Sequence, residues 1–228
     1  MAFRIRKPGK TTIVVLTFSR PITTTTIKTF MKTDSNNLKI IQYIKSLINV
    51  DDNVLNESIS RCTIKHFKKK ETISKSGNTD RELFFIEDGF IRLFITDSKG
   101  KQHTTHFAIP NVFIADYTAL ASGLPAMYTL EAIEDTKMIV ISNENLQYLY
   151  SNLKEGELLG RKILNQYFYY FDNRLQHFYT HTPQERFDLM NSIFPDIHNK
   201  VPQHMIASYI NITSVHLSRL KKQAHLKT

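Results

Sequence analysis

Residues 83–95 read LFFIEDGFIRLFI, two β-rich runs that flank Gly89. Aromatic and β-branched residues favour strands, and glycine accepts the positive φ of a tight hairpin, so we expect two strands joined at Gly89. DSKG at residues 97–100 supplies the next turn. Similar short runs occur throughout residues 63–142, namely CTIKHF, ETIS, QHTTHFAI, YTLEAI and KMIVIS. Many short strands at close spacing predict an antiparallel sandwich or barrel.

Helical patterns lie on both sides of this β-rich region. The apolar residues of segment 38–48 recur at steps of three and four, which predicts an amphipathic helix. Shorter helices are expected at residues 54–59 and 143–150. We therefore expect residues 35–150 to form one domain built around the β-rich region.

A long helix is predicted over residues 157–179, within a segment that spans residues 151–181. One stripe of this helix steps by four, three, four and three residues, the spacing of a coiled-coil seam: Leu164, Phe168, Phe171, Leu175 and Phe178. A second apolar stripe lies beside it: Ile163, Tyr167 and Tyr170. We expect one stripe to pack on the β-rich domain and the other to meet a second copy in a homodimer. The alternative is that both stripes are core of this chain.

Residues 182–228 are predicted to form a helix-turn-helix domain. Thr182 and Pro183 are a capping residue and a first-turn proline ahead of QERFDLMNSIF. Further on, Pro202–Ile210 and Ser214–Gln223 read as two helices joined by a turn. Asn tolerates a left-handed backbone, which suits Asn211 to that turn, and Thr213 is placed to cap the second helix.

The formal charge of +9 is concentrated at the two ends of the chain. Residues 1–34 hold seven basic and one acidic side chain, for a net charge of +6, and we read them as a flexible extension in which Met31 is a second candidate start. Residues 35–196 hold 18 basic and 20 acidic side chains, for a net charge of −2. Residues 197–228 hold five basic and no acidic side chains. The acid-free helix-turn-helix is thus suited to the phosphates of double-stranded DNA.

The second helix of this pair carries the expected DNA contacts. Small groups at its start permit close approach to the major groove, and an arginine can bond the guanine edge through two donors. The candidate DNA-binding residues are Thr213, Ser214, Val215, His216, Ser218, Arg219 and Lys222.

Several other classes of protein are disfavoured. No apolar run approaches the roughly 18 residues of a membrane span, and no signal-peptide cleavage pattern follows the basic start, so we expect a cytoplasmic protein. Cys62 is the single cysteine, which excludes an internal disulfide and suggests core packing. The pairs His103/His106 and His177/His181 lack an evident third ligand, so we expect neither a metal nor another cofactor. No phosphate loop, nucleophile elbow or HExxH motif is present, so we expect no enzyme.

LFFIEDGFIRLF, TPQERFDLM and VPQHMIASYINITSVHLSRLKK together resemble the Crp/Fnr transcription regulators, and look closest to their Bacteroidetes-type branch. The resemblance runs from about Leu38 to Lys222. It implies a cyclic-nucleotide-binding-like β-roll as the effector domain, a dimerisation helix and a winged helix-turn-helix, with RNA polymerase as a further candidate partner. The base-reading positions it implies are Ser214, Val215, His216 and Arg219. Ser214-Val215 replaces the Arg-Glu pair of the cyclic-AMP receptor protein, so we expect a different operator.

The resemblance also locates the effector segment. Nucleotide-binding members use Gly-Glu for the ribose and Arg-Ser for the cyclic phosphate, where this chain has Ala115-Asp116 and Ala126-Met127. Without the guanidinium a buried phosphate loses its charge-assisted partner, so we expect no response to cyclic AMP. Polar candidates for another small-molecule effector are Asp116, Tyr117, Thr118 and Tyr128; the alternative is that they only close the barrel.

Two functions remain after this reading. The first is a dimeric, sequence-specific transcription regulator. The second is a ligand-sensing or protein-interaction module whose helix-turn-helix does not read DNA.

Overall fold

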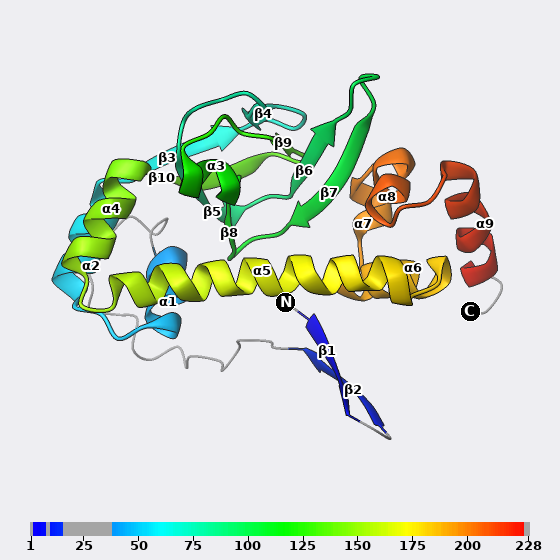
Figure 1. The fold of residues 1–228 in the computed structure, drawn as a ribbon, viewed down its shortest axis with the longest axis horizontal. Helices are drawn as coiled ribbons and strands as arrows, with labels where there is room; N and C mark the ends of the chain where they lie inside the picture. Colours follow the sequence, from blue (N-terminus) through cyan, green and yellow to red (C-terminus); the bar gives the residue numbers. More distant parts are fainter. Residues whose placement is uncertain (1, 8–9, 16–37, 226–228) are drawn as a thin grey trace.

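The computed structural model describes residues 2–7, 10–15 and 38–225. Its centre is a β-roll of two four-stranded sheets, ordered β3-β10-β5-β8 and β4-β9-β6-β7 (Figure 1). Every strand pair within them is antiparallel. The strands are β3 (Thr63–Phe67), β4 (Thr72–Ser74), β5 (Glu82–Asp88), β6 (Ile91–Thr96), β7 (Gln102–Ala108), β8 (Phe113–Ile114), β9 (Thr129–Ala132) and β10 (Thr136–Ser142). The predicted antiparallel β-roll is confirmed.

The expected hairpin at Gly89 is wrong, because β5 and β6 lie in different sheets. The chain crosses from one sheet to the other at this glycine, whose φ is 106°. A Cβ atom here would lie 2.3 Å from Thr136 Oγ1, so the crossing requires glycine for both conformation and space. The turn at Asp97–Gly100 does join two paired strands, β6 and β7, with Gly100 at a φ of 78°.

The helices surround the roll and continue beyond it. They are α1 (Leu38–Leu47), α2 (Asp52–Ser60), α3 (Tyr117–Ser122), α4 (Asn143–Asn152), α5 (Gly156–Thr180), α6 (Pro183–Ile193), α7 (Ile197–Lys200), α8 (Gln203–Tyr209) and α9 (Ser214–His225). Figure 1 shows α5 running along the whole roll, from α1, α2 and α4 at one end to α6–α9 at the other. The helices expected from periodicity are all present, whereas α3 and α7 were not predicted.

Three hydrophobic clusters hold these elements together. One fills the space between the two sheets and contains Leu93 and Met138. A second joins the roll to α1, α2, α4 and α5 around Phe85 and Ile44. A third joins the roll to α6–α9, because Phe107 of β7 packs with their apolar residues. The C-terminal helices are therefore docked on the roll rather than attached only through α5.

The two apolar stripes of α5 have different environments. Tyr167 and Tyr170 of the second stripe face the roll, with ring centroids 4.2 Å from Tyr117 and 4.2 Å from His106. The seam stripe is largely uncovered: Leu164, Phe168 and Leu175 are 49%, 68% and 53% exposed. The alternative in which both stripes are core of this chain is therefore wrong for these seam residues.

Two expectations about the ends of the chain differ from the structure. Where residues 1–34 were expected to lack regular elements, β1 (Ala2–Lys7) and β2 (Lys10–Val15) pair antiparallel, in keeping with the strand preference of their β-branched residues. Residues 16–34 lie outside the described residues, so their flexibility stays a prediction. The described residues from 182 to 225 contain helices and no strand, so they supply no wing. Residues 194–202, which join α6 to α8, contain α7 and two prolines and no strand.

Candidate nucleic-acid interface

The helix-turn-helix consists of α8, a turn at residues 210–213, and α9. Asn211 has a φ of 56°, the left-handed conformation expected from the sequence. The hydroxyl of Thr213 accepts a hydrogen bond from the backbone N–H of His216 at 3.2 Å, so this threonine caps α9 as predicted. Leu217 and Leu220 are buried against α8, which fixes the rotation of α9 about its axis.

This rotation turns the remaining face of α9 outward. Of the seven candidate DNA-binding residues, His216 is half-buried and the other six are exposed: Thr213, Ser214, Val215, Ser218, Arg219 and Lys222. Val215 is 64% exposed although it is apolar, and a valine side chain can contact a thymine methyl group. In the described part of the chain, Arg219 takes part in no ion pair. Its guanidinium group is therefore available to an external partner.

The docking of α8 on the β-roll was not predicted from the sequence. The backbone N–H of Thr104 on β7 donates to Ser208 Oγ at 2.9 Å, across a separation of 104 residues. The Tyr209 ring lies 5.0 Å from that of Phe107, and its hydroxyl lies 2.7 Å from the Tyr170 hydroxyl. Arg174 of α5 donates to the Tyr209 carbonyl. These contacts hold the helix-turn-helix at one orientation relative to both β7 and α5.

Arg92 on β6 supports the same region and is 1% exposed. Its Nε donates to Thr104 Oγ1 at 2.9 Å and its Nη1 to Gln102 Oε1 at 2.8 Å, while the Glu131 carboxylate lies 4.0 Å away. Burial lowers the pKa of Arg92 and Glu131 opposes that shift. A buried charge of this kind persists only where its donors are satisfied. The sequence pattern of this strand did not predict that Arg92 would be buried and hydrogen-bonded beneath the docked helices.

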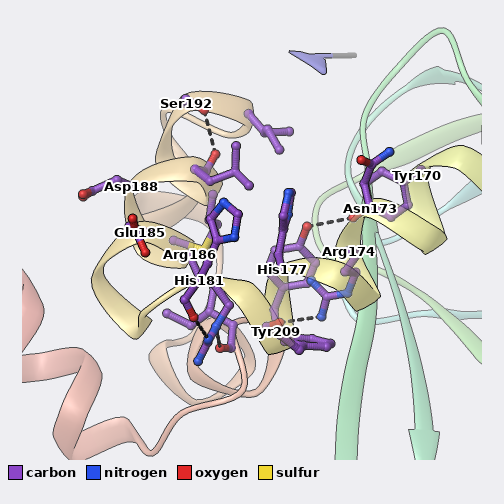
Figure 2. Close-up of a pocket in the computed structure, with 15 residues that line it drawn as sticks. Tyr170, Asn173, Arg174, His177, His181, Glu185, Arg186, Asp188, Ser192 and Tyr209 are labelled. Atoms are coloured by element: carbon purple, nitrogen blue, oxygen red, sulfur yellow. Dashed lines mark hydrogen bonds between the residues drawn. The ribbon is translucent and has the colours of Figure 1, made fainter. Parts of the chain in front are cut away.

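A cavity of about 430 Å³ lies where α5, α6 and the end of α8 meet (Figure 2). Arg174, His177 and His181 enter it from the last turns of α5 or just beyond, and Arg186 enters from α6. The rings of His177 and His181 are 4.3 Å apart, as their four-residue spacing suggested. Across the described residues, no group of three or more His, Cys, Asp and Glu is arranged to hold a metal ion.

The two histidines of the other pair, His103 and His106, have different partners. His103 Nε2 lies 2.8 Å from Asp97 Oδ2, whereas His106 packs edge-on against Tyr170. The buried Nδ1 of His106 has no hydrogen-bond partner, and burial together with the Arg174 charge lowers the pKa of this histidine to about 3. His106 is thus a neutral packing residue at the base of the docked helices.

The four candidate effector residues have different environments. The Asp116 carboxylate caps α3 through the Ala119 N–H at 3.0 Å and also accepts from the backbone N–H groups of Met127 at 2.6 Å and Tyr128 at 3.0 Å. Tyr117 is buried against α5. Thr118 is exposed and Tyr128 is half-buried. This geometry favours the reading in which these residues close the barrel.

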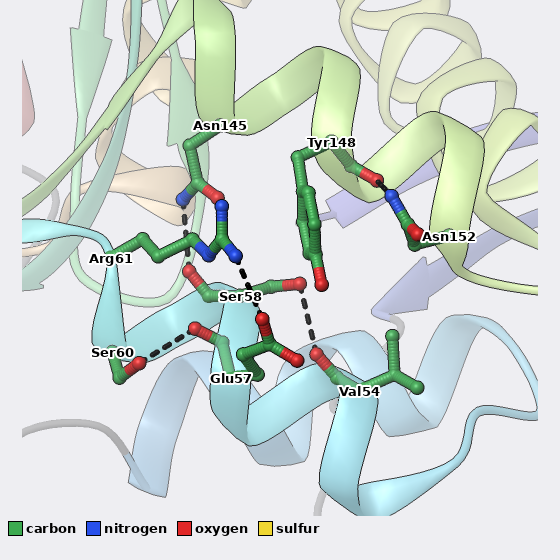
Figure 3. Close-up of polar contacts among 8 residues, drawn as sticks. All are labelled: Val54, Glu57, Ser58, Ser60, Arg61, Asn145, Tyr148 and Asn152. Atoms are coloured by element: carbon green, nitrogen blue, oxygen red, sulfur yellow. Dashed lines mark hydrogen bonds and ion pairs between the residues drawn. The ribbon is translucent and has the colours of Figure 1, made fainter.

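Cys62 lies at the end of α2, beside α4. Asn145 Nδ2 donates to Cys62 Sγ at 3.0 Å. It also donates to the Ser58 carbonyl at 2.9 Å, and the Arg61 guanidinium carbon lies 3.9 Å from the centroid of the Tyr148 ring (Figure 3). Burial raises the pKa of the Cys62 thiol to about 11, against the opposing effect of Asn145. The thiol is therefore a packing group, as expected.

Comparison with known proteins agrees with this geometry. The family model described as cyclic nucleotide-binding domain matches residues 64–152. The c-di-GMP-responsive regulator CLP of Xanthomonas campestris superposes with a TM-score of 0.59 at 10% identity, over 78% of this chain and 93% of that one. FixK2 from Bradyrhizobium japonicum gives 0.57 at 17% identity, over 73% and 85%. A Crp/Fnr-family transcriptional regulator from Thermus thermophilus gives 0.56 at 15% identity, over 72% and 87%.

Sequence comparison with curated proteins finds no match. None of the helices in the described residues is both long and apolar enough to cross a membrane. At the identities above, the likeness to solved structures concerns the fold. Residues 64–152 therefore match the cyclic nucleotide-binding domain family, and the fold of the chain is similar to that of Crp/Fnr transcription regulators.

Proposed function

We propose that this chain is a dimeric transcription regulator that reads an operator with α9. The observation that carries the proposal is the outward face of α9, on which Arg219 and Lys222 are exposed without an ion-pair partner among the described residues. No acidic residue occurs from residue 197 onward. A phosphate backbone therefore meets no repulsive charge from this segment.

In this proposal, successive segments of the chain have different roles. Residues 35–150 act as the effector domain, residues 151–181 as the dimerisation helix and residues 182–228 as the DNA-binding domain. The exposed seam of α5 supports dimerisation, because large apolar side chains left in water favour association. A non-catalytic role in the cytoplasm, with RNA polymerase as a further partner, belongs to the same proposal.

We further infer that cyclic AMP does not control this regulator. The Asp116 carboxylate already accepts from the Met127 and Tyr128 N–H groups, in the segment that the Crp/Fnr resemblance assigns to the cyclic phosphate. A second anion there would be repelled by this carboxylate and would find no arginine at Ala126 or Met127. Calorimetry with cyclic AMP should show no binding, and micromolar affinity would contradict the inference.

The test of DNA reading begins with selection of genomic fragments bound by the full chain. Affinity for a selected fragment is then measured by fluorescence anisotropy for the native chain and for Arg219→Ala. A lost bidentate base contact costs about 1–3 kcal/mol, so we expect Arg219→Ala to weaken binding about 5- to 150-fold. Arg161→Ala is the matched control, because Arg161 is exposed near the other end of α5.

Salt dependence adds a second readout. Lys222→Ala should weaken binding to all fragments alike and reduce the slope of log affinity against log salt by about 1. If Arg219→Ala and Lys222→Ala both bind as the native chain does, α9 does not read DNA. The alternative of a ligand-sensing or protein-interaction module would then replace the proposal.

A further inference from the structure

The cavity at the end of α5 plays no part in the proposed DNA contact or in the segment around Asp116. Its volume of about 430 Å³ lies within the roughly 300–1,000 Å³ of typical small-molecule sites. Its walls come from α5, α6 and the end of α8, three elements that meet where the long helix passes into the helix-turn-helix (Figure 2).

Two arginines supply the positive charge of this cavity. Arg186 donates from Nε to the Ile210 carbonyl at 3.0 Å and from Nη1 to the His181 carbonyl at 2.6 Å. Arg174 donates to the Tyr209 carbonyl. These partners are neutral carbonyl groups, and within the described residues neither arginine forms an ion pair. Burial, and after it the charge of Arg174, lowers the pKa of Arg186, so the two guanidinium groups repel each other.

Two acidic residues, Glu185 and Asp188, also line the cavity. Glu185 accepts from the backbone N–H of Thr182 at 2.8 Å, as part of the capping box that begins α6. Asp188 accepts from Gln184 Nε2 at 2.8 Å and points away from the space between the arginines (Figure 2). In the described part of the chain, neither carboxylate forms an ion pair with Arg174 or Arg186.

Part of the remaining wall is apolar or aromatic. The Arg174 guanidinium carbon lies 3.8 Å from the Tyr209 ring centroid and 4.8 Å from that of Phe178. Leu189 and Ile193 line the side formed by α6. Inorganic phosphate would satisfy the charge but leave these surfaces in contact with water, whereas a flat apolar body would cover them.

We propose that this cavity binds a small aromatic carboxylate, with its carboxylate group between Arg174 and Arg186 and its ring against Phe178 and Leu189. A carboxylate matches the planar donors of arginine and offsets their mutual repulsion. Because the ligand would bridge α5 and α6 beside the end of α8, it would favour one orientation of the DNA-binding helices. This last consequence rests on the proposed regulator function, whereas binding itself does not.

The binding test uses calorimetry on the full chain with 1-naphthoate, and with 1-naphthamide as the neutral analogue of the same shape. Saturable binding of the carboxylate is expected, at least about tenfold tighter than that of the amide, since charge-assisted hydrogen bonds are roughly twice as strong as neutral ones. Arg186→Met should weaken carboxylate binding at least about tenfold. Arg161→Met removes an arginine elsewhere on α5 and should leave binding unchanged.

A second variant guards against a folding defect in Arg186→Met. Ile193→Trp fills the cavity while both arginines stay, so it should abolish carboxylate binding. Its tryptophan would be the first in a chain that has none, so the fluorescence of this residue also reports whether the variant is folded. Absence of carboxylate binding to the native chain overturns the proposal, as does equal affinity for carboxylate and amide, or undiminished binding by a folded Ile193→Trp chain.

Operator affinity is measured separately, with and without 1-naphthoate. A change in affinity that Ile193→Trp removes supports coupling between the cavity and α9. Unchanged operator affinity despite carboxylate binding overturns the coupling and leaves the site in place. If the chain binds the carboxylate but no DNA, the regulator proposal fails while the ligand site stands.

Discussion

Phe168 should be the residue on which the dimer depends most. It is 68% exposed in the middle of the α5 seam. A phenylalanine presents about 200 Å², so full coverage by a second copy removes roughly 140 Å² from water, about 3.5 kcal/mol per protomer at about 25 cal/mol per Å². In a two-fold symmetric dimer, both copies of Phe168 lie in the interface, so each dimer gains this contribution twice. If the partner covers only a third of it, Phe168→Ala still costs about 2 kcal/mol per dimer and weakens the dimer about thirtyfold.

Sedimentation velocity over a range of concentrations measures this change directly. Tyr179→Ala is the matched control, because Tyr179 is 83% exposed on the same helix but lies outside the seam. Its loss should leave the dissociation constant within about threefold of the native value. Circular dichroism of each variant shows whether the helix itself is retained.

Two results would refute the reasoning. One is a native chain that stays monomeric at all concentrations, since the exposed seam would then have no partner copy. The other is a dimer that Phe168→Ala and Tyr179→Ala weaken equally, because association would then follow exposed aromatic surface rather than the seam.

Three further predictions concern stability and reactivity. Phe107→Ala should destabilise the chain by about 3–5 kcal/mol in urea unfolding, and should speed proteolysis near residue 181, because the Phe107 ring joins β7 to α8. Lowering the pH from 6.5 toward about 3 should reduce the free energy of unfolding by up to about 1.4 kcal/mol per pH unit, because His106 takes up a proton in the unfolded chain but not in the folded one. In urea unfolding at several pH values, His106→Phe should lack this part of the pH dependence. At neutral pH, iodoacetamide should modify Cys62 far more slowly in the folded than in the urea-unfolded chain, because the folded thiol has a pKa of about 11.

Local chemistry in the sequence was enough to predict most helices and their ends. Thr182 caps α6, Asn211 takes the left-handed conformation and Thr213 caps α9, each as expected from a few neighbouring residues. The three- and four-residue spacing of α5 likewise predicted two faces. Such features depend on contacts within one or two helical turns, which the residue pattern contains.

The candidate site was predicted only in part. The outward face of α9 follows from Leu217 and Leu220, whose helical spacing requires them to turn inward together. The candidate effector residues were chosen by type and position, and Asp116 instead bonds backbone groups of its own chain. The spacing of apolar residues along the sequence does not predict which backbone groups a polar side chain contacts across a loop.

The sequence by itself therefore determined the β-rich centre, the amphipathic helices and the basic helix-turn-helix, because hydrophobic period, capping and charge are local properties. Only the tertiary structure decided that the chain changes sheets at Gly89, that Ser208 meets Thr104, and that Arg174 and Arg186 share one cavity. The Ser208–Thr104 contact joins residues 104 positions apart. Contacts at such separations form only when whole sheets and helices pack, because their geometry is set by the burial of many side chains at once.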